Sequence, residues 1–296
     1  MSTDHPLPPL SASVSTLNDS APTDSSASTD QLMQVAVKSG EQTHDQKRDK
    51  AFDHLSRKFR RNIYQTFKGK LRLAILERDF EALNLHQAPL SILDIGAGQG
   101  QYALMLAKKG HHLTLIEPAI EMLTLAQESF LREGLEANFY QESLEKLPEL
   151  PLPQFDLITC HAMIEWLPEP ERFLQLALPT LKPGGKLSLL FYNREGLIYH
   201  NLIRGNYYYV EKGQFQGEKG SLTPISPICP KWLKEQIEKY QLTLLKESGI
   251  RTYYDFMAPA ARQRISEEDH LAMELRYSER SEYQGHARYL HWLLEK

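Results

Sequence analysis

Residues 91–102 read SILDIGAGQGQY, a short apolar run that ends in Asp94 and Ile95 and is followed by Gly96, Gly98 and Gly100. Glycines at this spacing permit a sharp turn and a close approach of the backbone to a ligand, because no Cβ stands in the way. The segment after the loop predicts a helix, and a helix N-terminus favours an anionic group. The stretch therefore predicts a strand, a ligand-binding loop and a helix in succession.

Short apolar runs and longer amphipathic segments alternate from about residue 48 onward, which is typical of β-α-β units in a mostly parallel sheet. The stretch 193–230 interrupts this alternation with GNYYYVEKGQFQGEKG. An insertion after a strand end is where an open α/β fold carries its specificity. The predicted strands span 91–95, 112–116, 137–141, 155–160, 186–192, 242–250 and 287–293, with helices at 101–109 and 120–133.

Functional side chains follow three further predicted strands. Glu117 follows the second strand in LTLIEP, where a carboxylate can accept hydrogen bonds from both hydroxyls of a ribose. Ser143 and Leu144 follow the third strand in YQESLEKL, where backbone groups can contact an adenine edge. His161 follows the fourth strand in FDLITCHAMIEWL. We expect these residues to face one crevice at the carboxyl ends of the strands.

The glycine spacing distinguishes two classes of cofactor loop. A dinucleotide-binding fingerprint requires glycine at position 101, where this chain has Gln101, so a nicotinamide-dependent oxidoreductase is disfavoured. The G-x-G-x-G loop, Glu117, the residues after the third and fourth strands, and LKPGGKLSLLFYN with a Pro-Gly-Gly turn before the fifth strand resemble the class I methyltransferases over residues 85–195. This resemblance implies a Rossmann-like α/β fold with a seven-stranded, mostly parallel sheet, helices on both faces, one reversed strand near the C-terminus, and S-adenosyl-L-methionine as cofactor.

A more specific resemblance covers most of residues 50–230. The segments KFRRNIYQTFKGKLR, CHAMIEWLPEP and LLFYNREGLIYHNLIRGNYYYV are similar to those of the bacterial tRNA 5-carboxymethoxyuridine methyltransferases, although Ala97 and Gln99 stand where the family is expected to have glycine and glutamate. Carried over by position, the resemblance implies cofactor contacts at Arg72, Gly96, Ala97, Glu117, Ser143, Leu144 and His161, to which we add Asp94 and Gly98 of the loop. Arg72 suits the cofactor's carboxylate, which a guanidinium binds with two parallel hydrogen bonds.

Residues 56–72 carry seven Lys or Arg and no acidic residue, in a chain whose formal net charge is -4. Such a run is either a solvated basic helix face or a surface that contacts the phosphates of an anticodon stem-loop. Single-stranded RNA loops are bound by stacking on aromatic rings and by polar contacts to splayed bases. The predicted substrate-binding residues are Arg60, Arg61, Tyr64, Tyr192, His200, Arg204 and Tyr207.

The implied reaction needs no catalytic base, because a carboxylate acceptor, with a pKa of about 4, is already ionised at neutral pH. Catalysis then consists of alignment and exclusion of water. We therefore assign no catalytic residue, and take Tyr192, Arg204 and His200 as candidates for positioning the acceptor, with Arg204 and Tyr192 favoured as anchors of its carboxylate.

The rest of the chain sets the context. Residues 1–46, rich in Ser, Thr, Asp and Pro, predict a disordered tail before a methyltransferase domain at 47–296, in which 193–230 is the substrate-specificity insertion. The absence of a signal sequence and of a long apolar run favours the cytoplasm and no membrane contact, and Cys160 and Cys229 predict ordinary thiols and no metal site. The oligomeric state is not indicated.

Two alternatives remain open from the sequence. A methyltransferase of a small-molecule carboxylic acid would share every cofactor motif, and only the basic run and the Tyr-rich insertion argue against it. A protein that binds cofactor or RNA without catalysis is the other alternative, and an intact loop with its acidic partner argues against that one.

Overall fold

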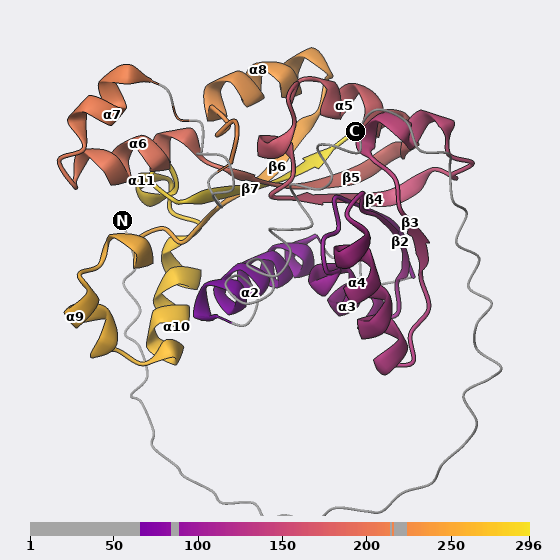
Figure 1. Cartoon of the computed structure of the whole chain (residues 1–296), viewed down its shortest axis with the longest axis horizontal. Coiled ribbons are helices and arrows are strands. Elements are labelled where there is room, and N and C mark those ends of the chain that lie inside the picture. The colour runs from indigo at the N-terminus through magenta and orange to yellow at the C-terminus, as the bar shows by residue number, and fades with distance from the viewer. Residues whose placement is uncertain (1–65, 84–88, 214, 216–223) are drawn as a thin grey trace, which may run out of the picture. The chain divides into compact units, whose positions relative to one another are not determined.

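The computed structural model describes residues 66–83, 89–213, 215 and 224–296. Their seven strands form one sheet in the order β3-β2-β1-β4-β5-β7-β6 (Figure 1). The neighbours from β3 to β5 pair in parallel, whereas β7 is antiparallel to both β5 and β6, so the predicted fold and its reversed strand are confirmed. The strands are β1 Ser91–Ile95, β2 His112–Ile116, β3 Asn138–Tyr140, β4 Phe155–His161, β5 Leu181–Tyr192, β6 Thr243–Ile250 and β7 Tyr289–Glu295.

The fifth strand begins earlier than the sequence predicts. Residues 183–185 were expected to form a turn before a strand at 186, but they lie inside β5. Phe155 pairs with Leu181 and Leu157 pairs with Lys186, so the extra residues of β5 form an irregularity at this point. Gly184 has φ +71°, which the missing Cβ allows. The Pro-Gly-Gly segment therefore forms a bulge near the start of β5 instead of a turn that precedes the strand.

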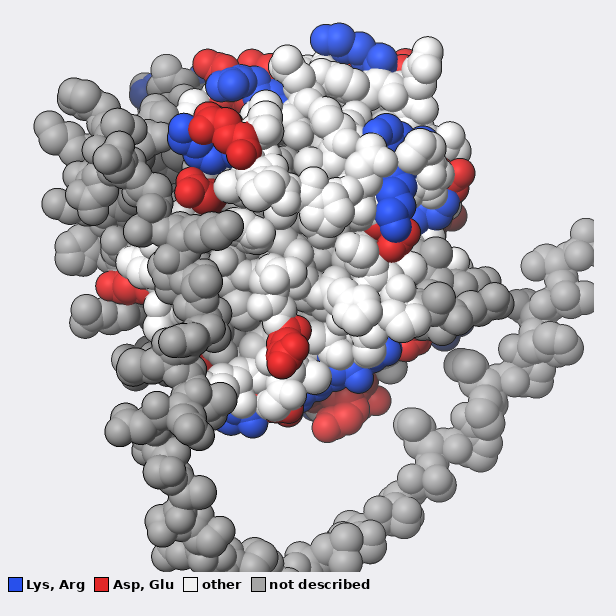
Figure 2. Space-filling model, turned by 90° about the vertical axis from the view of Figure 1, so that its right-hand side faces the viewer, with Lys and Arg blue, Asp and Glu red and all other residues white. Residues whose placement is uncertain are grey.

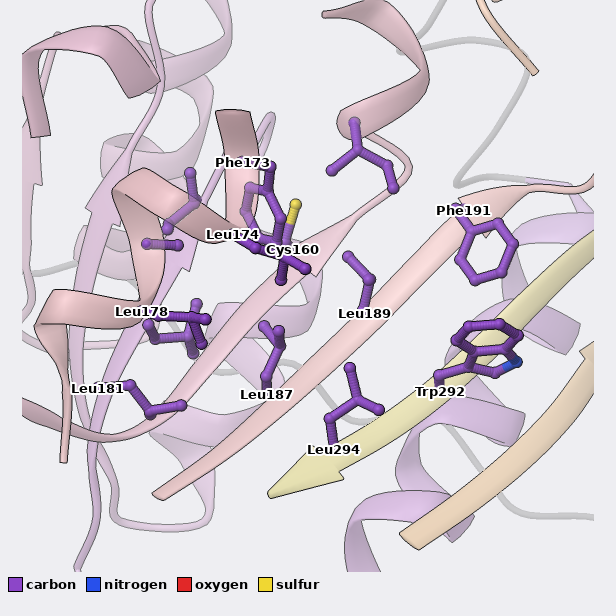
Figure 3. Close-up of a cluster of buried hydrophobic side chains, with 14 of the residues drawn as sticks. Cys160, Phe173, Leu174, Leu178, Leu181, Leu187, Leu189, Phe191, Trp292 and Leu294 are labelled. Atoms are coloured by element: carbon purple, nitrogen blue, oxygen red, sulfur yellow. The ribbon is translucent and has the colours of Figure 1, made fainter. Parts of the chain in front are cut away.

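Helices cover both faces of the sheet, as predicted (Figure 1). One buried cluster joins α2, α3 and α4 to residues such as Ile92 and Leu157, and the other joins α5 and α8 to residues such as Leu187 and Trp292. Figure 3 shows the second cluster, in which the rings of Phe191 and Trp292 lie 5.0 Å apart between centroids. The α-helices are α2 Phe67–Ala82, α3 Gln101–Lys108, α4 Ile120–Arg132, α5 Arg172–Ala177, α6 Arg194–Leu202, α7 Tyr207–Lys212, α8 Pro230–Lys239, α9 Pro259–Gln263, α10 Glu267–Tyr277 and α11 Ser281–Gln284.

The described part of the insertion after β5 consists mainly of α6 and α7. Asn193 caps α6, because its side-chain oxygen accepts a hydrogen bond from the N–H of Glu195, and its Nδ2 donates to the carbonyls of Gly285 and Ala287. Gly196, in the first turn of α6, packs directly on the same backbone, since a Cβ there would lie 2.2 Å from the Ala287 oxygen. The insertion is thus fastened to the segment that leads into β7.

Charge is mixed on the side of the molecule shown in Figure 2. Lys and Arg side chains there lie beside Asp and Glu side chains instead of gathering into one patch of a single sign. In the described ranges, none of the helices is long and apolar enough to cross a bilayer, and no group of three or more His, Cys, Asp or Glu is arranged to hold a metal ion.

Candidate active site

The glycine loop between β1 and α3 is held against the end of β2. The N–H groups of Gly96 and Ala97 both donate to the Ile116 carbonyl, at 2.9 and 3.1 Å. Gly96, Gly98 and Gly100 all have positive φ, between 57° and 70°. A Cβ on Gly96 would lie 2.4 Å from Cγ of Met163, so this position also needs the space that glycine leaves. The loop is therefore a fixed cradle of backbone.

Glu117, directly after β2, supports that loop with its carboxylate. Oε2 accepts a hydrogen bond from the N–H of Gly98 at 2.8 Å, and Oε1 accepts one from the N–H of Ala119 at 3.0 Å. The side chain is buried, yet it lines the cavity in front of the loop. A carboxylate oxygen can accept more than one hydrogen bond, so Glu117 is of a chemistry that can also bind hydroxyl groups of a ligand.

The predicted cofactor residues surround two adjoining cavities at the carboxyl ends of β1, β2 and β4. The larger cavity is lined by the predicted residues Arg72, Gly96, Gly98, Glu117, Ser143, Leu144 and His161. Asp94 and Ala97 line the smaller cavity, which shares Arg72, Gly96 and His161 with the larger one. The structure thus brings all nine residues together, from segments as distant in the sequence as α2 and β4.

Several cavity residues were not found from the sequence. Met122 comes from α4, whereas Met163, Trp166 and Leu167 follow β4 in CHAMIEWL. A tryptophan so soon after a strand end was the available signal, since large aromatic side chains often form the apolar wall of a ligand site. These side chains add large apolar groups to the lining of the cavity.

A chain of buried hydrogen bonds ends at His161. Its Nε2 contacts Oγ of Ser188 at 2.8 Å, that hydroxyl contacts Nε2 of His291 at 2.8 Å, and Nδ1 of His291 contacts Asp79 at 2.7 Å. Burial lowers the pKa of His161 well below its usual value, and the adjacent His291 and Arg72 act in the same direction. His161 is therefore neutral, with its ring fixed from behind the cavity.

The Asp94 carboxylate forms a hydrogen bond within the protein. Oγ1 of Thr159 donates a hydrogen bond to its carboxylate at 2.7 Å, and burial raises its pKa to about 6. The predicted loop residue thus links β1 to β4 beneath Gly96 and also borders the smaller cavity.

Glu165 is a buried acid that the sequence did not single out. Its side chain is fully buried, and in the sequence it lies between Met163 and Trp166, which line the cavity. Burial raises its pKa to about 7, against the smaller opposing effects of backbone N–H groups and of Arg72. Part of the Glu165 population is therefore protonated at neutral pH.

Replacing Glu165 with glutamine is expected to change the pH dependence of stability. The folded state raises the pKa of Glu165 from 4.5 to about 7, so the stability that its proton contributes is present below pH 4.5 and is lost as the pH rises through 7. Glutamine needs no proton. The free energy of unfolding of Glu165→Gln should rise relative to the parent by on the order of 1–2 kcal/mol between pH 5.5 and 8.

Urea unfolding at pH 5.5, 7 and 8 measures this difference, with the exposed Glu128→Gln on α4 as matched control. A difference between Glu165→Gln and the parent that stays constant over this range would contradict the assignment.

The predicted substrate residues fall into three groups. Arg60, Arg61 and Tyr64 lie outside the described residues, as does the predicted tail. Tyr192 is buried at the end of β5, and its hydroxyl accepts a hydrogen bond from Arg288 at 2.8 Å. His200, Arg204 and Tyr207 lie on or beside α6 and α7, where His200 is buried and the other two are exposed. Neither of the two cavities is lined by Tyr192, His200, Arg204 or Tyr207.

Comparisons with known proteins agree with this geometry. Residues 93–189 match a family model described as a methyltransferase domain. Among solved structures, the plantazolicin methyltransferase BpumL with SAH has a TM-score of 0.53 at 19% identity, covering 84% of this chain and 95% of its own. The [4+2]-cyclase SpnF has a TM-score of 0.56 at 16% identity, covering 85% and 96%. At such identities the structures establish only the fold, and the cyclase shows that the fold alone does not fix the reaction.

The topology, the glycine loop with its acidic partner and the matched domain define a class I methyltransferase that uses S-adenosylmethionine. The tRNA 5-carboxymethoxyuridine methyltransferase of Escherichia coli (strain K12) is 35% identical over 248 residues, which are 82% of this chain and 95% of that protein. A ubiquinone biosynthesis O-methyltransferase of Xanthomonas axonopodis pv. citri (strain 306) is 32% identical over only 39% of this chain and 48% of its own. The chain belongs to the tRNA 5-carboxymethoxyuridine methyltransferase family.

Proposed function

We propose that this protein methylates the carboxyl group of 5-carboxymethoxyuridine at the wobble position of tRNA, giving the methyl ester. The observation that carries the proposal is the extent of the relationship to the Escherichia coli enzyme, which covers 82% of this chain and is therefore too long to be confined to the cofactor half. A tRNA substrate also supports the cytoplasmic location expected from the sequence. We keep residues 47–296 as the methyltransferase domain, with 193–230 as its substrate-specificity insertion.

The cavity fits S-adenosylmethionine. Gly96 leaves room where any side chain would strike Met163, and Arg72 presents a guanidinium to a carboxylate. Glu117 offers acceptors for ribose hydroxyls, and Ser143 and Leu144 lie where the adenine is expected. His161, Asp94, Ala97 and Gly98 complete the proposed cofactor site. When bound, the cofactor supplies a methyl group on a cationic sulfur, which an ionised carboxylate accepts directly, with release of the neutral thioether.

No proton needs to be removed from such an acceptor, so the residues of the chain orient the reactants and exclude water. His161 is neutral and is held by Ser188, which suits a positioning role. Trp166 and Leu167 form an apolar wall that keeps water from the anionic nucleophile. Tyr192, Arg204 and His200 remain candidates for positioning the acceptor.

An exposed apolar and aromatic surface on α6 and α7 supports RNA as the substrate. Tyr207 and Tyr208 are 61% and 70% exposed, and Leu202 and Ile203 lie exposed at the preceding helix end. Aromatic rings of this kind stack with splayed bases of single-stranded loops. Arg204, between the two helices, adds a positive charge for phosphates or the acceptor carboxylate.

Methyl transfer from labelled S-adenosylmethionine tests the proposal with two substrates, tRNA carrying the carboxymethoxyuridine and the same tRNA lacking it. We expect label only in the first, as an ester that mild alkali releases. Labelling of neither tRNA by a protein that binds the cofactor would overturn the wobble-uridine assignment and make a small-molecule carboxylic acid the leading acceptor.

A further inference from the structure

A cluster of arginine and tyrosine side chains lies where β5 and β6 end and β7 begins. Tyr289, the first residue of β7, pairs with Tyr192 on β5 and with Ile250 on β6. Arg251 directly follows β6, and Arg288 directly precedes β7. The sheet order therefore brings both arginines to the edge at which the parallel strands end, the same edge that carries the glycine loop.

Asp255 fixes the two guanidinium groups. Its Oδ2 accepts a hydrogen bond from Nε of Arg251 at 3.0 Å and from Nε of Arg288 at 3.1 Å. Nη1 of Arg288 donates to the Tyr192 hydroxyl at 2.8 Å, which sets the plane of that guanidinium. Both arginine side chains keep about a seventh of their surface exposed, at 15% and 14%, so a ligand can reach them.

Positive charge exceeds negative charge in this cluster. Lys68 also forms an ion pair with Asp255, at 3.2 Å, so three cations share one carboxylate among the described residues. Burial, together with the nearby charges of Arg288 and Arg204, lowers the pKa of His200 to about 4. Nδ1 of His200 is buried and has no hydrogen-bond partner among the residues described. The electrostatic potential of the cluster therefore favours binding of an anion, and Nδ1 of His200 can form a hydrogen bond to a ligand.

The cluster adjoins the cofactor cavity. Arg72, which lines that cavity, places its guanidinium carbon 4.5 Å from the centroid of the Tyr289 ring, and Arg251 places its own 5.6 Å from the same centroid. The Tyr289 ring also packs against the Tyr192 ring at 5.2 Å. The Tyr289 ring thus packs both with Arg72, the proposed partner of the cofactor's carboxylate, and with Arg251 of the arginine pair.

We propose that Arg288 and Arg251, held by Asp255, bind the carboxylate of the methyl acceptor. This inference rests on the proposed function and replaces the pair Arg204 and Tyr192 as its main anchor, with Tyr192 acting through Arg288. Asp255 accepts from Nε of each arginine, and among the described residues Nη2 of Arg288 forms no hydrogen bond, so this donor is available to the acceptor. Because the product is an uncharged ester, the pair binds the substrate more tightly than the product, which favours release.

Binding of two tRNAs to Arg288→Gln tests the proposal. One tRNA carries 5-carboxymethoxyuridine and the other carries 5-hydroxyuridine at the same position, so they differ by the carboxymethyl group. We expect the parent to prefer the first by at least about tenfold, and Arg288→Gln to reduce that preference to near unity without weakening the second. Arg288→Lys, which keeps the charge but loses the planar fork, should retain part of the preference.

Two controls separate this effect from misfolding. The cofactor Kd of Arg288→Gln should stay within about twofold of the parent value, because Arg288 does not line either cavity. Arg132→Gln, at the exposed end of α4, removes a charge far along the chain from the cluster and should leave the preference unchanged.

Two results would overturn the inference. Equally weakened binding of both tRNAs to Arg288→Gln would show that Arg288 binds RNA phosphate instead of the carboxylate. Parental affinity for both tRNAs would show that it binds neither. The labelled-methyl assay on the parent protein tests the proposed function separately. If the parent esterifies the carboxymethoxyuridine tRNA, either of these results overturns only the role of Arg288 and not the proposed function.

Discussion

Replacing Glu117 with alanine is expected to weaken S-adenosylmethionine binding by about a hundredfold, because one carboxylate serves both the loop and the ligand. The substitution leaves the N–H groups of Gly98 and Ala119 without their acceptor. It also removes the acceptors proposed for the ribose hydroxyls. Hydrogen bonds to a charged group contribute roughly 1.5–3 kcal/mol each, and tenfold in affinity corresponds to about 1.4 kcal/mol, so loss of one or two such bonds gives this range.

Isothermal titration with the cofactor measures the change. Glu117→Gln keeps one carbonyl oxygen and should fall between the parent and Glu117→Ala. Glu128→Ala, on the exposed face of α4, removes a carboxylate elsewhere and should bind normally. Near-parental affinity in a folded Glu117→Ala protein would show that the loop does not depend on this carboxylate.

The substitution Gly196→Ala is expected to reduce methyl transfer to tRNA by at least about a hundredfold while cofactor affinity changes only a few-fold. A Cβ at this position would lie 2.2 Å from the carbonyl oxygen of Ala287 and 3.0 Å from that of His286. Backbone atoms cannot rotate away as a side chain can, so α6 must move off the segment that leads into β7. That movement displaces α6 from the arginine pair proposed to hold the acceptor, whereas β1, β2 and β4 keep the cofactor residues in place.

Gly285→Ala is the matched control, because no atom lies within 4 Å of a Cβ built there and its φ is negative. Cofactor titration and the labelled-tRNA assay on both variants give the comparison, and thermal unfolding reports any loss of fold. Full activity of Gly196→Ala would mean that α6 is not needed in this position.

The cofactor half was predictable because its signals are local. Apart from Arg72, which lies in α2, each predicted residue there lies in or just after a strand or loop that the sequence indicates, and β1 and β2 span the predicted residues 91–95 and 112–116. In parallel β-α-β units, strand ends meet at one edge, so position along the chain sufficed to bring Gly96, Glu117 and His161 together.

The acceptor half was not predictable in the same way. Arg288 meets Tyr192 across 96 residues, and His291 meets Asp79 across 212 residues, through an antiparallel strand whose partners no local pattern identifies. The anchors predicted from the sequence, Tyr192 and Arg204, lie at or soon after the end of β5, whereas Arg251 and Arg288, the pair proposed from the structure, are brought to that end of the sheet by the positions of β6 and β7. Both helices within 193–230 were also missed, because their segments carry many polar and aromatic residues.

The position of β7 between β5 and β6 has a consequence for the order of synthesis. A ribosome makes the chain from the N-terminus, so β5 and β6 emerge with a gap between them that only a later strand fills. Until Tyr289–Glu295 has been made, Arg288 has no strand to hold it and Asp79 lacks its buried histidine. The segments around the cofactor cavity are therefore made before Arg288, which is proposed to bind the carboxylate of the methyl acceptor, can be held in place.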